Sequence, residues 1–169
     1  VGAPVDAAAT HAMVVLVEDS DPGRVVLSTH RVMLIVPVAV TGGEPTESLA
    51  ETLAALPERV AAGHYAGGRF QVLPLEGDLA LVELHRQLID NLLGKRSAEE
   101  VLMYTRDPVE AVRWVDEGRG QQAFFLHAPD LAVVLKLAQE GKVLPQKSTF
   151  FHPKPPSGMV FQRLDRPEP

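Results

Sequence analysis

A mixed α/β fold of the α+β kind is predicted for this chain of 169 residues by three observations. Short valine-rich runs bounded by glycine and proline are typical of strands. Longer runs with leucine at every third or fourth position are typical of helices. In the C-terminal half the two patterns alternate. The sequence therefore predicts a mixed sheet with a parallel β-α-β-α unit in that half and with helices packed on the sheet.

Three strands are expected near the N-terminus, at residues 12–18, 24–28 and 32–40. The run Asp19-Ser20-Asp21-Pro22-Gly23 consists of turn-forming residues and predicts a hairpin between the first two strands. A helix is then expected from about Thr46, because leucines recur there at helical spacing.

Pro57 ends this helix or begins a short second helix to about Ala62. A flexible loop at 63–68 and a strand at 70–75 are expected next. The leucine-rich stretch 81–93 gives the strongest helical pattern of the chain, and Gly94 is a suitable C-terminal cap.

The C-terminal half has the most regular pattern. A strand at 101–105 leads into a helix that begins with Asp107 as N-cap and Pro108 at its first position. A strand at 123–126 precedes a second helix, which starts after Asp130. These lengths predict a crossover between parallel strands. A last strand is expected at 159–164.

Composition excludes several classes of protein. The 16 Lys and Arg stand against 22 Asp and Glu, and this net charge of −6 argues against nucleic acid as the main partner. There is no cysteine, so disulfides and cysteine-ligated zinc are excluded. Apolar runs are far shorter than the roughly 20 residues that span a membrane. The histidines lack the spacings of metal motifs, so no metal site is expected.

The predicted organisation is a flexible segment at 1–11, a single globular domain at 12–164 and a tail at 165–169. No signal peptide is visible, and the absence of cysteine suits a reducing compartment, so a cytoplasmic location is expected. The chain begins without methionine, and we expect it to be the C-terminal portion of a longer protein.

Three clusters of polar side chains are candidates for a binding site. Basic and hydroxyl side chains supply the donors that phosphate and carboxylate groups accept. The third cluster lies in a proline-rich segment at 145–158, here called the strap. The strap has an alternative role as a rigid cover of the sheet, with Phe150 and Phe151 in the core and the lysines in solvent. The ligand-binding candidates are Thr29, His30 and Arg31 in the first cluster, Thr105 and Arg106 in the second, and Gln146, Lys147, Ser148, Thr149, His152 and Lys154 in the strap.

Five landmarks occur in order along the chain: D-P-G-R-V-V-L-S-T-H-R at 21–31, L-H-R-Q-L-I-D-N-L-L-G at 84–94, Y-T-R-D at 104–107, A-F-F-L at 123–126 and P-Q-K-S-T-F-F-H-P-K-P-P-S-G-M-V at 145–160. Together they resemble a bacterial family, the domain-of-unknown-function family numbered one thousand and fifteen. The chain departs from the family pattern at Leu144, where methionine is usual, and at Arg106, where histidine is common.

Members of that family are longer, and their upstream part carries a G-H-H-R-Y-type motif that this chain lacks. The upstream motif is similar to the nucleotide-contacting box of the ParB-like and free-serine-kinase group. The resemblance therefore implies the C-terminal portion of a protein that binds a nucleotide or transfers a phosphoryl group.

The leading hypothesis is that the chain contributes donors to a nucleotide or another phosphorylated small molecule, as part of a serine-kinase-like phosphotransferase. Lys147, Ser148 and Thr149 are the first candidates, and Thr29, His30 and Arg31 are the second. No catalytic residue is assigned. The competing hypothesis is a non-catalytic structural or dimerisation module. Neither nucleic acid nor membrane is an expected partner, whereas a second copy or an upstream domain of the same protein is.

Overall fold

The computed structural model describes residues 14–16, 18, 21, 23, 25–35, 40–57, 59–93, 96–156 and 158–159. The chain divides into two units, of which one is 26–150 and the other joins 1–25 with 151–169. The six-stranded sheet and all the helices reported below belong to unit 26–150. No helix in the described ranges is long and apolar enough to cross a membrane.

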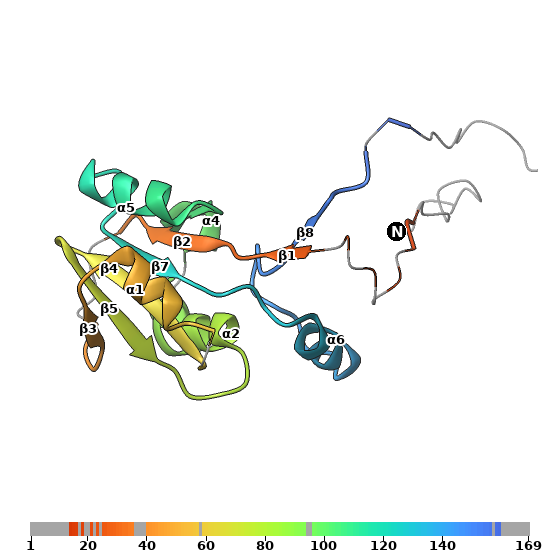
Figure 1. Ribbon diagram of the computed structural model, residues 1–169, viewed down its shortest axis with the longest axis horizontal. Helices are drawn as coiled ribbons and strands as arrows, with labels where there is room; N and C mark the ends of the chain where they lie inside the picture. The colour runs from red at the N-terminus through yellow and green to blue at the C-terminus, as the bar shows by residue number, and fades with distance from the viewer. Residues whose placement is uncertain are drawn as a thin grey trace, which may run out of the picture. The chain divides into compact units, whose positions relative to one another are not determined.

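Six strands form the main sheet (Figure 1). All their ladders are antiparallel. β1 (Val25–Leu27) and β8 (Phe150–His152) pair in a separate two-stranded sheet. In spatial order, the strands of the main sheet are β3 (Glu44–Thr46), β5 (Arg69–Pro74), β4 (Ala61–Ala66), β7 (Gln122–Phe125), β2 (His30–Met33) and β6 (Leu102–Thr105).

The mixed α+β class is confirmed, but the predicted parallel ladder is not found. β6 and β7 are joined through α5 (Pro108–Asp116), as the sequence pattern predicts. β2 lies between them and pairs antiparallel with each. The two strands therefore run in the same direction without sharing a hydrogen bond. A distant strand from the N-terminal half takes the central place, and a local pattern carries no information about such a long-range insertion.

Helices cover both faces of the sheet. α1 (Leu49–Ala54) and α5 pack with Val32, Tyr65 and Phe125 in one core, and Figure 1 shows α1 lying across β4 and β5. The second core contains Met33 and Phe124 on the other face. The remaining helices contribute to that second core: α2 (Ala80–Leu84), the π-helical turn η2 (His85–Ile89), α4 (Ala98–Val101) and α6 (Leu131–Gln139), with α3 (Asp90–Leu93) continuing directly from η2.

The predicted helix caps of the C-terminal half are confirmed. The carboxylate of Asp107 accepts a hydrogen bond from the backbone N–H of Val109 at 2.9 Å, and that of Asp130 accepts one from Ala132 at 2.8 Å. These bonds satisfy backbone donors that the first helical turn leaves without partners.

The expected short helix to Ala62 and the loop at 63–68 are wrong, because residues 61–66 form β4. The segment A-A-G-H-Y-A lacks β-branched residues, and its strand conformation depends on burial between β5 and β7. Gly63 packs closely against α1 and β7, since a Cβ there would lie 2.6 Å from Cγ2 of Thr52 and 3.0 Å from Cδ2 of Phe125. Gly67 and Gly68 have positive φ values of 55° and 76°, as a tight hairpin turn requires.

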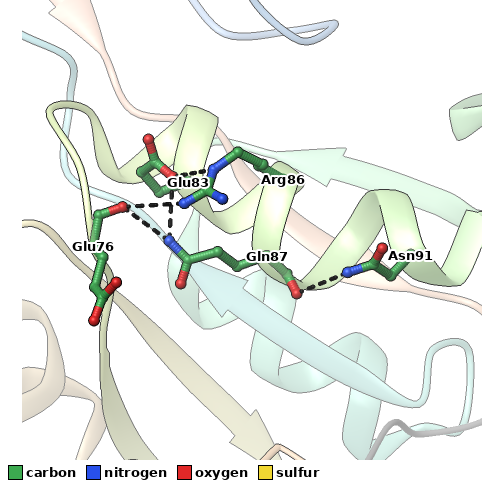
Figure 2. Close-up of polar contacts among 5 residues, drawn as sticks. All are labelled: Glu76, Glu83, Arg86, Gln87 and Asn91. Atoms are coloured by element: carbon green, nitrogen blue, oxygen red, sulfur yellow. Dashed lines mark hydrogen bonds and ion pairs between the residues drawn. The ribbon is translucent and has the colours of Figure 1, made fainter.

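The helix expected at 81–93 is confirmed as the continuous run α2, η2 and α3. Polar contacts on its outer side tie it to the loop after β5 (Figure 2). Arg86 donates from Nε to Glu83 at 2.7 Å, while Gln87 donates to the carbonyl oxygen of Glu76 at 3.0 Å and to Glu83 at 3.2 Å. The bonds from Arg86 and Gln87 outweigh the effect of burial and lower the pKa of Glu83. This outer network leaves the inner side of the run facing the sheet.

Several predicted strand segments lie outside the described residues. These are residues 12, 13 and 17 of the strand at 12–18, residues 36–39 of the strand at 32–40, and residues 160–164 of the last strand. The second predicted strand at 24–28 is represented by β1.

Candidate functional site

The three predicted polar clusters meet at the β2–β6 side of the sheet. His30 is the direct cross-strand partner of Thr105, and Arg31 is the partner of Tyr104. The Nη2 atom of Arg31 lies 3.4 Å from the carbonyl oxygen of Gln146 and 3.4 Å from that of Lys147. Two segments that are more than 70 residues from β2 in sequence are therefore brought to it, and Arg31 contacts both.

Arg31 is a buried cation with no carboxylate partner among the described residues. Only 1% of the residue is exposed. Its Nη1 atom donates to the carbonyl oxygen of Thr29, and the guanidinium carbon lies 5.7 Å from the centre of the Tyr104 ring. Its Nε atom has no hydrogen-bond partner in the described part of the chain. Burial lowers the pKa of Arg31 to about 10, which shows how poorly this environment solvates the charge.

Two further buried groups on this face have unpartnered polar atoms: Nε2 of His85 and the hydroxyl of Tyr104 make no hydrogen bond with any described residue. The Nδ1 atom of His85 lies 3.4 Å from a carboxylate oxygen of Asp90. Burial and the charge of Arg31 lower the pKa of His85, so its ring is neutral near pH 7. Burial raises the pKa of Tyr104, and Arg31 opposes that effect.

His30 points to the opposite face of the sheet from Arg31. Its Nδ1 atom accepts a hydrogen bond from the backbone N–H of Leu126 at 3.3 Å, and its ring meets the edge of Phe125 at a centroid distance of 5.7 Å. Burial, followed by the charge of Arg31, lowers the pKa of His30 to about 4. His30 is therefore a neutral core residue near pH 7, and it contributes no positive charge for binding an anion.

The donors of the second cluster are already engaged. The hydroxyl of Thr105 donates to Glu110 at 2.6 Å and accepts from the backbone N–H of Asp107 at 3.1 Å. The guanidinium carbon of Arg106 lies 4.3 Å from the centre of the Phe150 ring. The carboxylates of Asp107 and Glu110 thus already accept hydrogen bonds at the start of α5. Arg106 connects the second cluster to the strap through its contact with Phe150.

The strap contributes backbone groups to Arg31. Lys147 has a φ of 57°, a left-handed conformation that is rare for residues other than glycine, and its side chain is exposed. The Nε2 atom of Gln146 donates to Glu99 at 3.0 Å, and the hydroxyl of the buried Ser148 donates to the carbonyl oxygen of Pro145. Thr149 is half-buried. His152 and Lys154 are exposed and belong to the other unit.

Tyr104, His85 and Asp90 are absent from the set that the sequence predicts. A signal for His85 exists, because it stands on the apolar stripe of a helix where leucine is otherwise found. The pairing of Tyr104 with Arg31 depends on strand register, which no local pattern reveals. No group of three or more acidic or histidine side chains suited to a metal ion is found in the described ranges.

A separate hollow of about 530 Å³ lies at the other side of the sheet, over β3, β5 and β4. His64 and Gln71 contribute to its lining, and Gln71 donates to Nδ1 of His64 at 2.9 Å. Nε2 of His64 in turn donates to Gln122 at 3.0 Å. Burial lowers the pKa of His64, although the bond to Gln122 opposes it. Both ring nitrogens of His64 are therefore hydrogen-bonded, in contrast to Arg31, and the charged residues Glu47 and Arg69 also line the hollow.

No family model matches the chain, and no curated protein matches it. The resemblance to the domain-of-unknown-function family therefore stays a prediction. Solved structures are similar to the chain. Free serine kinase in complex with AMP matches at 18% identity and a TM-score of 0.56, over 81% of this chain and 57% of that chain. A mutant of free serine kinase in complex with ADP matches at 18% identity and a TM-score of 0.55 over the same shares.

A conserved hypothetical protein from Pyrococcus furiosus matches at 20% identity and a TM-score of 0.55, over 81% of this chain and 60% of that chain. The chain thus spans less than two thirds of the length of these structures. At such identities the likeness concerns the fold. This chain has the mixed α+β fold that is also found in free serine kinase.

Proposed function

We propose that this chain binds a nucleotide or another phosphorylated small molecule, with Arg31 as the central anion-binding group. The observation that carries the proposal is the burial of the Arg31 guanidinium without a carboxylate beside it in the described structure. Buried charges in proteins are normally paired, because removing an ion from water costs several kcal/mol. An anionic ligand would supply the missing partner.

Phosphate is the anion that suits this group best. The planar guanidinium matches two oxygens of a phosphate at once, and such charge-assisted bonds are about twice as strong as neutral ones. Lys147 and Arg106 add two cations that are contributed by the same converging clusters. Gln146, Ser148 and Thr149 lie beside Lys147 in the sequence, and Thr29 lies close to Arg31. His30 faces away, and His152 and Lys154 stay candidates from prediction alone.

The fold likeness supports the same class of ligand, because the similar free serine kinase structures hold AMP and ADP. We propose further that the chain is part of a serine-kinase-like phosphotransferase. Phosphoryl transfer depends mostly on positioning and on neutralising charge, which are tasks for groups such as Arg31. Since the chain spans 57% of the length of those kinases, the proposal includes residues from elsewhere in a longer protein.

Isothermal titration calorimetry of the chain with ADP and with O-phosphoserine tests the proposal. We expect at least one of the two to bind and Arg31→Gln to weaken that binding at least tenfold. Arg86→Gln is the matched control, because it removes the same charge from the exposed outer side of the helix in Figure 2. Lys147→Ala reports on the ammonium group. The proposal is wrong if neither compound binds or if Arg31→Gln binds as well as the unmodified chain.

The alternative of a structural or dimerisation module has one observation in its favour. The strap contacts Arg31 through neutral backbone carbonyls, and its Lys147 side chain is exposed, as expected of a cover. Light scattering with Phe151→Ala separates the two functions. Loss of assembly in this variant, with no ligand binding in any form of the chain, would support the module.

A further inference from the structure

We propose that Arg31, Tyr104 and His85 form a buried site that selects a phosphate group still carrying a proton, and that His85 accepts the hydrogen bond from that proton. This inference rests on the proposed function and specifies which form of phosphate the site prefers. It is motivated by three buried polar atoms that have no hydrogen-bond partner among the described residues: Nε of Arg31, the hydroxyl of Tyr104 and Nε2 of His85.

The three side chains lie on one face of the sheet. Arg31 and Tyr104 are directly opposite each other on β2 and β6, and paired residues of an antiparallel ladder project to the same side. Tyr104 packs against the core that also contains Leu84, which immediately precedes η2, and Ile89, the last residue of η2. His85 is 4% exposed and is influenced by the charge of Arg31. Arg31 is therefore the cross-strand neighbour of Tyr104, with its guanidinium carbon 5.7 Å from the ring centre, and its charge also acts on His85.

The hydrogen-bonding capacity of each group follows from its partners. A carboxylate only accepts hydrogen bonds, so the contact with Asp90 places the ring proton of neutral His85 on Nδ1. Nε2 is then a lone-pair acceptor. Nε of Arg31 can only donate, and the hydroxyl of Tyr104 can donate as well. The site consequently combines donors for ligand oxygens with one acceptor for a ligand proton.

This combination discriminates between anions of similar size. Phosphate near neutral pH still carries a proton and can donate it to Nε2 of His85, while its other oxygens accept from Arg31 and Tyr104. Sulfate has the same tetrahedral shape but no proton at this pH, so it would face the lone pair of Nε2 with an oxygen lone pair. Leaving a buried acceptor without a donor costs about 1–3 kcal/mol. Phosphate should therefore bind about 5- to 100-fold more tightly than sulfate.

A ligand bound at Arg31 would displace the strap carbonyls of Gln146 and Lys147 from the guanidinium. Two carbonyl oxygens approach Nη2 of Arg31 at 3.4 Å, which is longer than a typical N–H···O distance. Replacing these two long neutral bonds by bonds to a charged oxygen favours the ligand. The left-handed backbone of Lys147 lies in this same short segment.

Calorimetric titration of the full chain with inorganic phosphate and with sulfate, at fixed pH and ionic strength, tests the inference. We expect phosphate to bind at least fivefold more tightly than sulfate. In His85→Leu the preference should disappear, because phosphate weakens while sulfate does not. Tyr104→Phe should weaken both anions alike, and Arg86→Gln should leave both unchanged. Circular dichroism melts of each variant establish that it is folded. If His85→Leu is not folded, the ratio of phosphate to sulfate affinity in Tyr104→Phe is the second test: it should equal that of the unmodified chain, and loss of the preference in this variant would overturn the role of His85.

The outcomes separate this inference from the proposed function. Equal binding of phosphate and sulfate, with both abolished in Arg31→Gln, leaves an anion site at Arg31 and overturns the role of His85. A preference for phosphate that persists in His85→Leu overturns it too. If neither inorganic anion nor ADP nor O-phosphoserine binds, the proposed function and the inference are both wrong.

Discussion

Replacing Arg31 with Met should stabilise the ligand-free chain and abolish anion binding at the same time. The fall in the pKa of Arg31 to about 10 corresponds to roughly 3 kcal/mol against the charged form, since each pKa unit is worth about 1.4 kcal/mol. Burial is the main cause. The penalty is fully present at neutral pH, where the guanidinium is charged in both the folded and the unfolded chain, and it fades only as the pH rises above about 10.

Methionine has a similar length and no charge to desolvate. The substitution removes the hydrogen bond to the Thr29 carbonyl and two longer ones to the strap carbonyls. A typical hydrogen bond contributes about 0.5–1.5 kcal/mol net, and the two bonds of 3.4 Å belong at the low end of that range, so the three offset only part of the gain. The net expectation is a gain of about 1–2 kcal/mol in the free energy of unfolding. For a chain of this size that gain raises the Tm by roughly 2–8 °C.

Thermal denaturation followed by circular dichroism, with and without inorganic phosphate, measures both effects. Phosphate at about 100 times its Kd should add about 2.7 kcal/mol to the unmodified chain and nothing to Arg31→Met. The reasoning is refuted if Arg31→Met melts several degrees lower than the unmodified chain without ligand. An equal phosphate-induced shift in both proteins would refute it as well.

Three other predictions concern the sheet and the strap. Stability to urea should fall as the pH drops from 6.5 to 4, because burial and Arg31 lower the pKa of His30 to about 4 and the unfolded chain then binds the extra proton. His30→Gln should flatten this dependence, and an unchanged slope would contradict the assignment. Lys147→Gly should be about 1 kcal/mol more stable than Lys147→Ala in chemical denaturation, since only glycine adopts a φ of 57° without strain; equal stabilities would show that the left-handed turn costs nothing. Gly63→Ala should lower the unfolding free energy by about 1–3 kcal/mol through overlap with Thr52 and Phe125. Gly43→Ala should cost less in the same assay, because its new Cβ meets mainly the flexible end of Gln71.

Local signals in the sequence are enough for the C-terminal helices and their caps. Asp107 and Asp130 cap α5 and α6 as predicted, because capping involves residues that are close in sequence. β4 is missed because its alanines and glycine form a strand only when β5 and β7 pair on both sides. The parallel ladder is wrong for a related reason, since β2 joins the sheet from far upstream.

The candidate site shows the same division. The residue types of an anion site can be predicted from composition alone, and Arg31 is in the predicted set. Its central role depends on burial and on the absence of a nearby carboxylate in the described structure, which are properties of the folded chain. Lys147 contacts Arg31 through its carbonyl oxygen, while the binding role predicted for its ammonium group stays a proposal.

The π-helical turn at His85–Ile89 changes which residues of one continuous helix lie next to each other. Its backbone N–H from Asp90 bonds to the carbonyl oxygen of His85, five residues earlier. In a regular α-helix, residues five apart point about 140° away from each other, and the two side chains could not meet. The π-helical turn closes its hydrogen bond over five residues instead of four, and this wider turn brings the carboxylate of Asp90 alongside the His85 ring. Deleting one residue between His85 and Asp90 would restore the regular helix and leave the two residues four apart, still on one face of it.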